Sequence, residues 1–184
     1  LRLARVAREA AHDRRRQRAM TSMTDLDGAT LVGWVRAILR RDLGTLRREL
    51  DLYADDAGPW RKVPGLANSG GTLALHLAGN LRHFVGARLG GSGYVRDRAA
   101  EFAERDVPRA KLIAQVDAAM HEADAALAAL DPRRLLEEFP DPVAGVRLTT
   151  GDLLLHLLVH LTYHLGQLNA HRRVVSGDAS SVGA

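Results

Sequence analysis

Four long stretches of this sequence place apolar side chains at steps of three and four residues, and this spacing most limits the folds open to the chain. The first runs from about Gly28 to Tyr53, and the others span about 71–89, 108–130 and 150–174. The stripe of the first stretch is Leu31, Val35, Ile38, Leu39, Leu43, Leu46 and Leu50. Such steps are typical of an amphipathic helix, whereas a half-buried strand alternates at every second residue. Because no stretch alternates for long, the sequence predicts an all-α fold.

The ends of these stretches carry helix start signals. We expect Thr72 to cap the second helix and Asp106 to cap the third, because short polar side chains accept hydrogen bonds from the first free backbone N–H groups. Thr149 or Thr150 is expected to cap the fourth helix, whose first turn holds Asp152.

Two long connections, 90–107 and 131–149, separate the last three helices. At up to ~3.3 Å per residue, each can run the length of a helix bundle, so neighbouring helices are allowed to be parallel. The second connection contains "PRRLLEEF", which predicts a short helical turn. Together these features predict a four-helix bundle with long crossover connections.

The positive charge of the chain is concentrated at its start. Residues 1–19 hold seven arginines and two acidic residues, a net charge of +5, and the whole chain carries +4, so the remainder sums to −1. Since a nucleic-acid-binding domain needs a basic face, we expect no nucleic-acid partner. The alternatives left open are DNA binding through the arginine-rich arm and a transit-like segment.

We expect a single domain between two non-structural ends. The chain begins with Leu1, and "MTSMTD" from Met20 looks like an ordinary start. Residues 1–19 are therefore expected to be a disordered or non-native basic extension. Residues 20–174 are expected to form one helical bundle domain, followed by a polar tail over residues 175–184.

The composition excludes several kinds of chemistry. The chain has no cysteine, which excludes disulfides, thiolate ligands and a cysteine nucleophile. Apolar residues make up 46% and charged residues 26%, as in a soluble globular protein. No apolar run approaches the roughly 20 residues that cross a bilayer, and no signal peptide is visible. We therefore expect a cytoplasmic protein without a membrane partner.

The segment "HLLVHLTYHLGQ" repeats histidine at intervals of four, as His156, His160 and His164. Residues four apart on a helix differ by about 40° around the axis and lie about 6 Å apart along it. Either adjacent pair could bind one ion through bonds of ~2.1 Å. The outer two histidines, ~12 Å apart, are too distant to share an ion. A single metal would therefore use one adjacent pair, which the equal spacing cannot choose, and a third ligand from elsewhere.

The second helix offers that third ligand in "LALHLAGNLRHF", where His76, Asn80 and His83 lie on one face. The sequence has no HExxH motif and no pair of ExxH motifs, which disfavours a zinc-protease site and a carboxylate-bridged di-iron site. A mononuclear site of three histidines remains, with open positions for water or substrate. The alternative is that these histidines are buried and hydrogen-bond to their neighbours, because a lone HxxxH is a weak signal.

Taken together, "TLALHLAGNLRHF" and "HLLVHLTYHLGQ" resemble the DinB/YfiT-like superfamily of metal-binding four-helix-bundle proteins, over about 28–173. The resemblance implies that His76, His160 and His164 are the metal ligands, with His156 beside them in the pocket. It also implies a homodimer. Leu165 stands where many relatives have an arginine after the last ligand, which removes an anion contact that such an arginine would make.

Two polar residues are expected to support the ligands from outside the coordination sphere. Gln167 lies one turn beyond His164, and Asn80 lies one turn beyond His76. The candidates for a general base are His156, Asp152 and His83.

The resemblance implies a function less firmly than a fold. It implies one divalent ion, with zinc, nickel and iron not distinguished. Some relatives look like thiol-dependent transferases or isomerases and others like hydrolases. Since this chain lacks cysteine, thiol chemistry would need an external low-molecular-weight thiol. We expect a metal-dependent transferase or hydrolase acting on a small molecule. The alternative is a non-catalytic metal protein that binds or senses a small ligand.

Overall fold

The computed structural model describes residues 27–143 and 145–182, so the expected basic extension over 1–19 lies outside the described residues. The described part of the chain is helical and contains isolated bridges but no strand. The predicted all-α class is therefore confirmed. None of the described helices has a stretch that is both long enough and apolar enough to cross a membrane.

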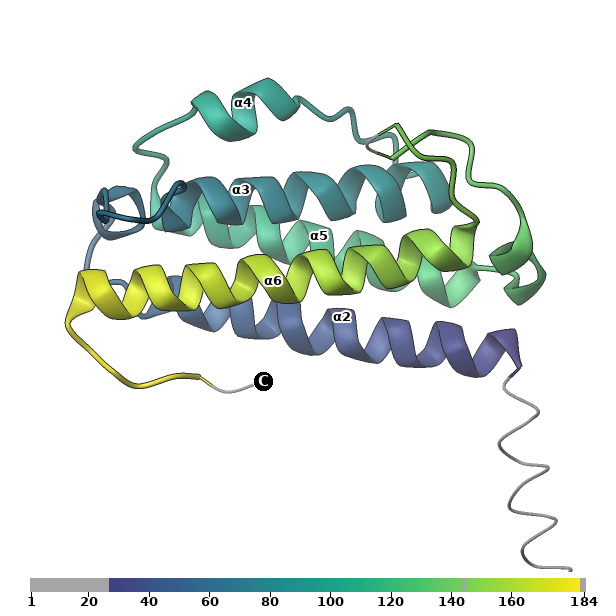
Figure 1. The fold of residues 1–184 in the computed structure, drawn as a ribbon, viewed down its shortest axis with the longest axis horizontal. Helices are drawn as coiled ribbons and strands as arrows, with labels where there is room; N and C mark the ends of the chain where they lie inside the picture. The colour runs from purple at the N-terminus through teal and green to yellow at the C-terminus, as the bar shows by residue number, and fades with distance from the viewer. Residues whose placement is uncertain (1–26, 144, 183–184) are drawn as a thin grey trace, which may run out of the picture.

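Long helices lie side by side in Figure 1 and make up the body of the molecule. They are α2 (Gly28–Asp51), α3 (Gly70–Leu81), α5 (Arg109–Ala129) and α6 (Thr150–Ser176), and a π-helix, η2 (Arg82–Leu89), continues α3. Both α2 and α3 pack against α5 and against α6. In Figure 1, α3 and α5 run in one direction, and α2 and α6 run in the other.

The core lies between these helices and is built mainly from leucine. In α2, Leu39, Leu43, Leu46 and Leu50 of the predicted stripe are buried, as the helical period requires. The other helices contribute Leu73, Leu77, Leu81, Leu112, Leu127, Leu153, Leu157, Leu161 and Leu168. This packing fixes the relative positions of α3 and α6, the two helices that carry the histidine motifs.

The N-terminus of α3 differs from the prediction. Ser69, not Thr72, is the N-cap, and its hydroxyl accepts a hydrogen bond from the backbone N–H of Thr72. The first turn of the helix therefore contains two glycines, Gly70 and Gly71. A Cβ at Gly71 would lie 2.6 Å from the ring of Trp60, so the close packing of the tryptophan accounts for the glycine there. In α6 the predicted cap is confirmed, since Thr149 accepts from the backbone N–H of Asp152.

The predicted cap of α5 is wrong. Asp106 adopts a left-handed backbone conformation (φ 57°), and the N-cap position is taken by Pro108, whose side chain makes no capping hydrogen bond. The backbone N–H of Arg109 instead donates to Asp56 from the loop after α2. A side chain distant in sequence thus replaces the local cap.

Each long connection contains a short helix. The first holds α4 (Arg98–Ala103), which was not predicted and whose N-cap Asp97 accepts from the N–H of Ala100. In Figure 1 this connection passes over α3 on its way back to the start of α5. The second holds η3 (Pro132–Leu136), the predicted helical turn. Because α4 packs against α3, the first connection contributes side chains to the surroundings of His76.

Candidate metal centre

Three histidines from two helices meet at one point. His76 on α3 and His160 and His164 on α6 each offer a ring nitrogen, and these nitrogens lie within 4.8 Å of one another. The Nε2 atoms of His76 and His160 are 3.2 Å apart. Two nitrogens bound to one tetrahedral ion at ~2.0–2.1 Å would be ~3.3–3.4 Å apart. The pair therefore already has the spacing that a shared ion requires, and the three side chains could hold a metal ion.

A buried carboxylate fixes the orientation of the His76 ring. Nδ1 of His76 lies 3.0 Å from Oε2 of Glu101, and Glu101 is only 6% exposed. Since a carboxylate accepts, Nδ1 carries the proton and Nε2 presents its lone pair to the other two histidines. Carboxylates in this position hold metal-binding histidines in one tautomer and raise their basicity.

Arg96 holds the same carboxylate from the other side. Its Nε and Nη2 donate to the two oxygens of Glu101 at 2.6 and 2.8 Å. Burial by itself raises the pKa of Glu101, but hydrogen bonds from Arg96 and His76 outweigh it, so the net pKa is lowered. Glu101 is therefore an anion at neutral pH, with both oxygens engaged.

The two histidines of α6 are also set up to offer lone pairs. Nδ1 of His164 donates to Oε1 of Gln167 at 2.8 Å, one turn further along the helix, which leaves Nε2 free. Burial, together with the nearby His164 and His76, lowers the pKa of His160 to about 4. His160 is consequently neutral at pH 7, the state in which imidazole binds a metal.

Close approach of α4 to α3 depends on a glycine. A Cβ at Gly79 would lie 2.2 Å from Oε1 of Glu101, so a side chain there would occupy the space of the carboxylate. Sequence reasoning identified neither Glu101 nor Arg96. The contact joins residues 25 apart through a connection that carried no helix prediction, and a glycine inside an apolar helix was the one local signal of a close approach.

A cavity of about 550 Å³ opens in front of the three histidines. None of the described residues that line it is acidic, and most come from α3, α4 and α6. They are Asn68, Leu73, His76, Asn80, Phe84, Arg96, Arg98, Phe102, Val143, His156, His160 and His164. The arrangement gives a small molecule access to the nitrogens that face the centre.

The remaining predicted residues fall in different places. His156 lines the cavity, is exposed, and stacks on His160 with ring centroids 6.1 Å apart. Asp152 and His83 are not among the lining residues: Asp152 accepts from the hydroxyl of Thr149. Asn80 lines the cavity, and none of the hydrogen bonds among the described residues joins it to a histidine of the centre.

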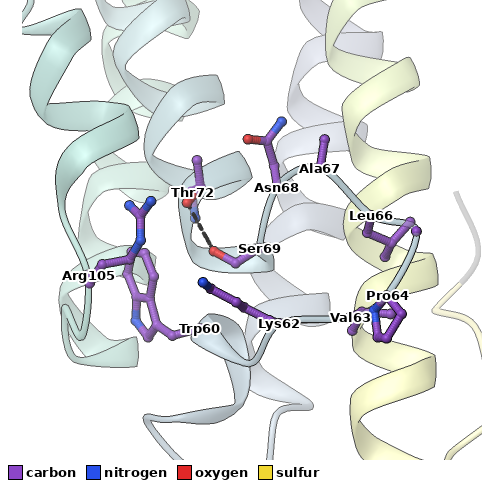
Figure 2. A pocket seen from close by; sticks show the side chains of 11 residues that line it. Trp60, Lys62, Val63, Pro64, Leu66, Ala67, Asn68, Ser69, Thr72 and Arg105 are labelled. Carbon is purple, nitrogen blue, oxygen red and sulfur yellow. Dashed lines mark hydrogen bonds between the residues drawn. The ribbon is translucent and has the colours of Figure 1, made fainter.

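A second cavity, of about 540 Å³, lies at the N-terminal end of α3 and shares Asn68 with the first. Figure 2 shows Lys62 and Arg105 among its lining side chains, together with the hydrogen-bonded pair Ser69 and Thr72. Within the described part of the chain, its lining includes no histidine and no acidic residue. It is therefore separate from the candidate metal centre, although it adds positive charge at this end of α3.

Comparison with known proteins agrees with this architecture. A family model described as the DinB superfamily matches residues 11–168, more than half of the chain. No curated protein and no solved structure gives a match. The chain belongs to the DinB superfamily.

Proposed function

We propose that this protein is a divalent-metal-dependent enzyme that uses an external thiol to act on a small molecule, with His76, His160 and His164 holding the ion. The observation that carries the proposal is the convergence of these three imidazoles at the wall of the 550 Å³ cavity. A bound divalent ion would lower the pKa of the thiol and hold its thiolate. The metal could be zinc, nickel or iron.

His156 is the group best placed to move a proton, because it lines the cavity and does not belong to the group of three. We assign the thiol proton to an imidazole nitrogen of His156. The sulfur then forms a bond to an electrophilic carbon of the second substrate, and the leaving group departs with its electron pair and takes up that proton. Histidine suits both steps because it exchanges protons near neutral pH.

Thiol transfer is favoured over hydrolysis by the character of the cavity. Hydrolysis would need a water molecule to be deprotonated and positioned for attack, and none of the described residues that line this cavity is a carboxylate that could assist. A hydrolase remains the second enzymatic candidate. The non-enzymatic candidate is a metal protein that binds or senses a small ligand. It is favoured by the scarcity of bases, because Asp152 and His83 do not line the cavity.

The experiment that tests the proposal compares two histidine variants. Metal content would be measured for the wild type, His164→Ala and His156→Ala, together with turnover of electrophiles in the presence of low-molecular-weight thiols. We expect His164→Ala to lose stoichiometric metal, and His156→Ala to keep the metal and lose turnover. A His164 variant that retains metal beside a metal-free His156 variant would move the centre one turn toward Asp152. Stoichiometric metal without turnover in the wild type would favour the binding protein.

We further propose that the long helices form a four-helix bundle of the DinB type. The direction of the helices in Figure 1 supports one crossover running the length of the bundle, between α3 and α5, while the other connections join helix ends on the same side.

A further inference from the structure

The second cavity, of about 540 Å³, is lined by two cations that lack an acidic partner. Among the described residues, Lys62 takes part in no hydrogen bond and no ion pair. Arg105 donates from Nη1 to the backbone carbonyls of Phe102 and Glu104, at 2.8 and 2.6 Å, which hold the guanidinium in place without balancing its charge. Figure 2 shows the amine end of Lys62 directed toward the side of the cavity that holds Trp60 and Arg105. Since none of the described residues that line the cavity is acidic, both charges are available to an anionic group.

A third polar side chain of this cavity also lacks a partner. No hydrogen bond among the described residues includes the side-chain amide of Asn68, whereas the hydroxyls of Ser69 and Thr72 bond to each other at 3.0 Å. Lysine and arginine can only donate hydrogen bonds, and the amide of asparagine can donate as well. A ligand that pairs with Lys62, Asn68 and Arg105 must therefore bring acceptors, and negatively charged oxygens are the acceptors that suit two cations.

The walls of the cavity are held in place by the protein itself. The turn 63–66 is closed by a 3.1 Å hydrogen bond from its last N–H to its first carbonyl, and Gly65 has the positive φ (83°) that a type II turn needs. Trp60 is fixed by a 3.0 Å hydrogen bond from its indole Nε1 to the carbonyl of Val107. A ligand therefore meets a site that needs little ordering, and the volume falls within the ~300–1,000 Å³ of small-molecule sites.

We propose that this cavity is a second ligand site, which binds a small organic anion, a carboxylate or a phosphate ester, through Lys62 and Arg105. The apolar part of the lining, Val63, Pro64 and Leu66, contacts the rest of the ligand. The site goes beyond the proposed function, because none of the three histidines lines this cavity and its ligand needs no metal.

The two lysines of the chain, Lys62 and Lys111, allow a test on the wild type with an internal control. Lys111 is exposed on α5 and does not line the cavity. The full chain, with and without one equivalent of zinc, would be acetylated at trace level, and each lysine would be quantified by mass spectrometry. Inorganic phosphate and succinate, added separately at constant ionic strength, distinguish a phosphate ligand from a carboxylate ligand.

We expect one or both anions to slow the acetylation of Lys62 in proportion to occupancy, equally with and without zinc, and to leave Lys111 unchanged. Equal changes at the two lysines, or no change with either anion, would overturn the inference and leave the proposed function standing. Protection that requires zinc would place the anion at the histidine centre and would also overturn it.

Variants then assign the contacts. Arg105→Gln and Lys62→Gln should each weaken binding of the protecting anion by about tenfold in titration calorimetry, because each removes one charged hydrogen-bond donor. Lys111→Gln and Arg173→Gln, at exposed positions of α5 and α6, are the matched controls and should bind as the wild type does. If Arg105→Gln binds the anion as tightly as the wild type, or if the controls lose as much affinity, the charge acts non-specifically and the proposal is wrong. The acetylation series needs no variant, so a variant that fails to fold leaves the test intact.

Discussion

At the scale of single residues, the histidines of the candidate centre depend on the groups that hydrogen-bond to their outward-facing ring nitrogens. His76 is backed by the anion Glu101, whereas His164 is backed by the neutral amide of Gln167. An anion behind the ring increases the electron density that the facing nitrogen can donate, whereas an amide chiefly fixes the tautomer. The two supports should therefore differ in their effect on metal binding.

Glu101→Gln tests the stronger support. It keeps the size of the side chain but removes the negative charge and leaves Arg96 without an ionic partner. We expect zinc affinity to fall by about 10- to 100-fold, measured by competition with a chromophoric chelator. Glu104→Gln, at the exposed end of the same short helix, is the control and should bind zinc as the wild type does. Equal affinities in the two variants would show that the charge of Glu101 does not act on the centre.

His171 on α6 illustrates a buried histidine with a structural role. Tyr53 donates its hydroxyl proton to Nδ1 of His171 at 2.7 Å, and Nε2 donates to the backbone carbonyl of Arg61 at 2.8 Å. Burial lowers the pKa of His171, and the hydrogen bond to Arg61 opposes this only in part. The folded state therefore holds the neutral ring.

This burial predicts a dependence of stability on pH. In the unfolded chain His171 has a pKa of about 6.5, so it takes up a proton below that pH. In the folded protein its lowered pKa keeps the ring neutral to lower pH. Stability is therefore full above that pH and falls as the pH drops through it. The variant His171→Gln can still donate to the carbonyl of Arg61. We expect its free energy of unfolding to fall less steeply with decreasing pH than that of the wild type, by up to about 1.4 kcal/mol per pH unit. Urea unfolding of the metal-free protein at pH 7.5 and 5.5 measures this.

The control for that measurement is His121→Gln, a change to an exposed histidine of α5. The free energy of unfolding should still depend on pH in every variant, because the pKa values of His83 and His160 are also lowered by burial. A slope in His171→Gln equal to that of the control would contradict the assignment.

At the scale of elements, the short helix α4 is the part of the fold that completes the centre. It brings Glu101 to α3 at the position where Gly79 leaves room. It is also anchored at its start, because Asp97 caps it and the neighbouring Arg96 binds Glu101. The contact between α3 and α4 thus needs both the space at Gly79 and the fixed position of Glu101.

Gly79→Ala tests this contact. The new methyl group would overlap the carboxylate, which is pinned between Arg96 and His76 and can move only by releasing one of them. We expect weaker zinc binding and lower thermal stability. Gly33→Ala, in α2 where a Cβ meets nothing within 4 Å, is the control and should raise stability by about 0.5–1 kcal/mol. A Gly79 variant that behaves like the control would mean that Glu101 is free to relocate.

At the scale of the whole molecule, the candidate centre joins α3 to α6. An ion that binds only the folded state stabilises it in proportion to its affinity and concentration. We expect removal of the metal by a chelator to lower the melting temperature, measured by circular dichroism. His76→Ala should reproduce the effect, and His121→Ala should not. An unchanged melting curve after demonstrated loss of the metal would contradict a centre that links the two helices.

The outer face of α2 and α6 predicts self-association. Trp34, Leu155, Val159 and Tyr163 are exposed there, with Val159 exposed to 70%, and a shallow groove next to them is almost entirely apolar. Exposed apolar patches of this kind usually mark interfaces, and a homodimer is the arrangement that the family resemblance implies. We propose that a second copy of the chain covers this face.

Val159→Glu should convert that dimer to a monomer, because it places a charge at the centre of the patch. Light scattering coupled to size-exclusion chromatography would measure the mass. Val95→Glu, at an exposed valine of the connection between α3 and α5, is the matched control and should remain dimeric. A wild-type protein that is monomeric at high concentration would overturn the proposal.

The choice of His76, His160 and His164 among the candidate histidines rested on the family resemblance. The sequence by itself determined the helical class, the approximate span of each long helix and the face of α6 that carries the repeated histidines. These features depend on local periodicity: a stripe at three- and four-residue steps, and an i, i+4 pair whose two members necessarily share a face of α6. Thr149 could be identified as a cap for the same reason, since it bonds within its own first turn.

Only the tertiary structure decided which polar groups surround His76. Glu101 reaches His76 across 25 residues, Asp56 replaces Asp106 at the start of α5, and Trp60 packs onto a glycine in the first turn of α3. Each of these contacts depends on how two elements meet. That meeting is set by the packing of the core and by a connection whose path leaves no periodic signal in the sequence. The support from within one helix, Gln167 beside His164, was therefore predictable, whereas the support from another element, Glu101 beside His76, was not.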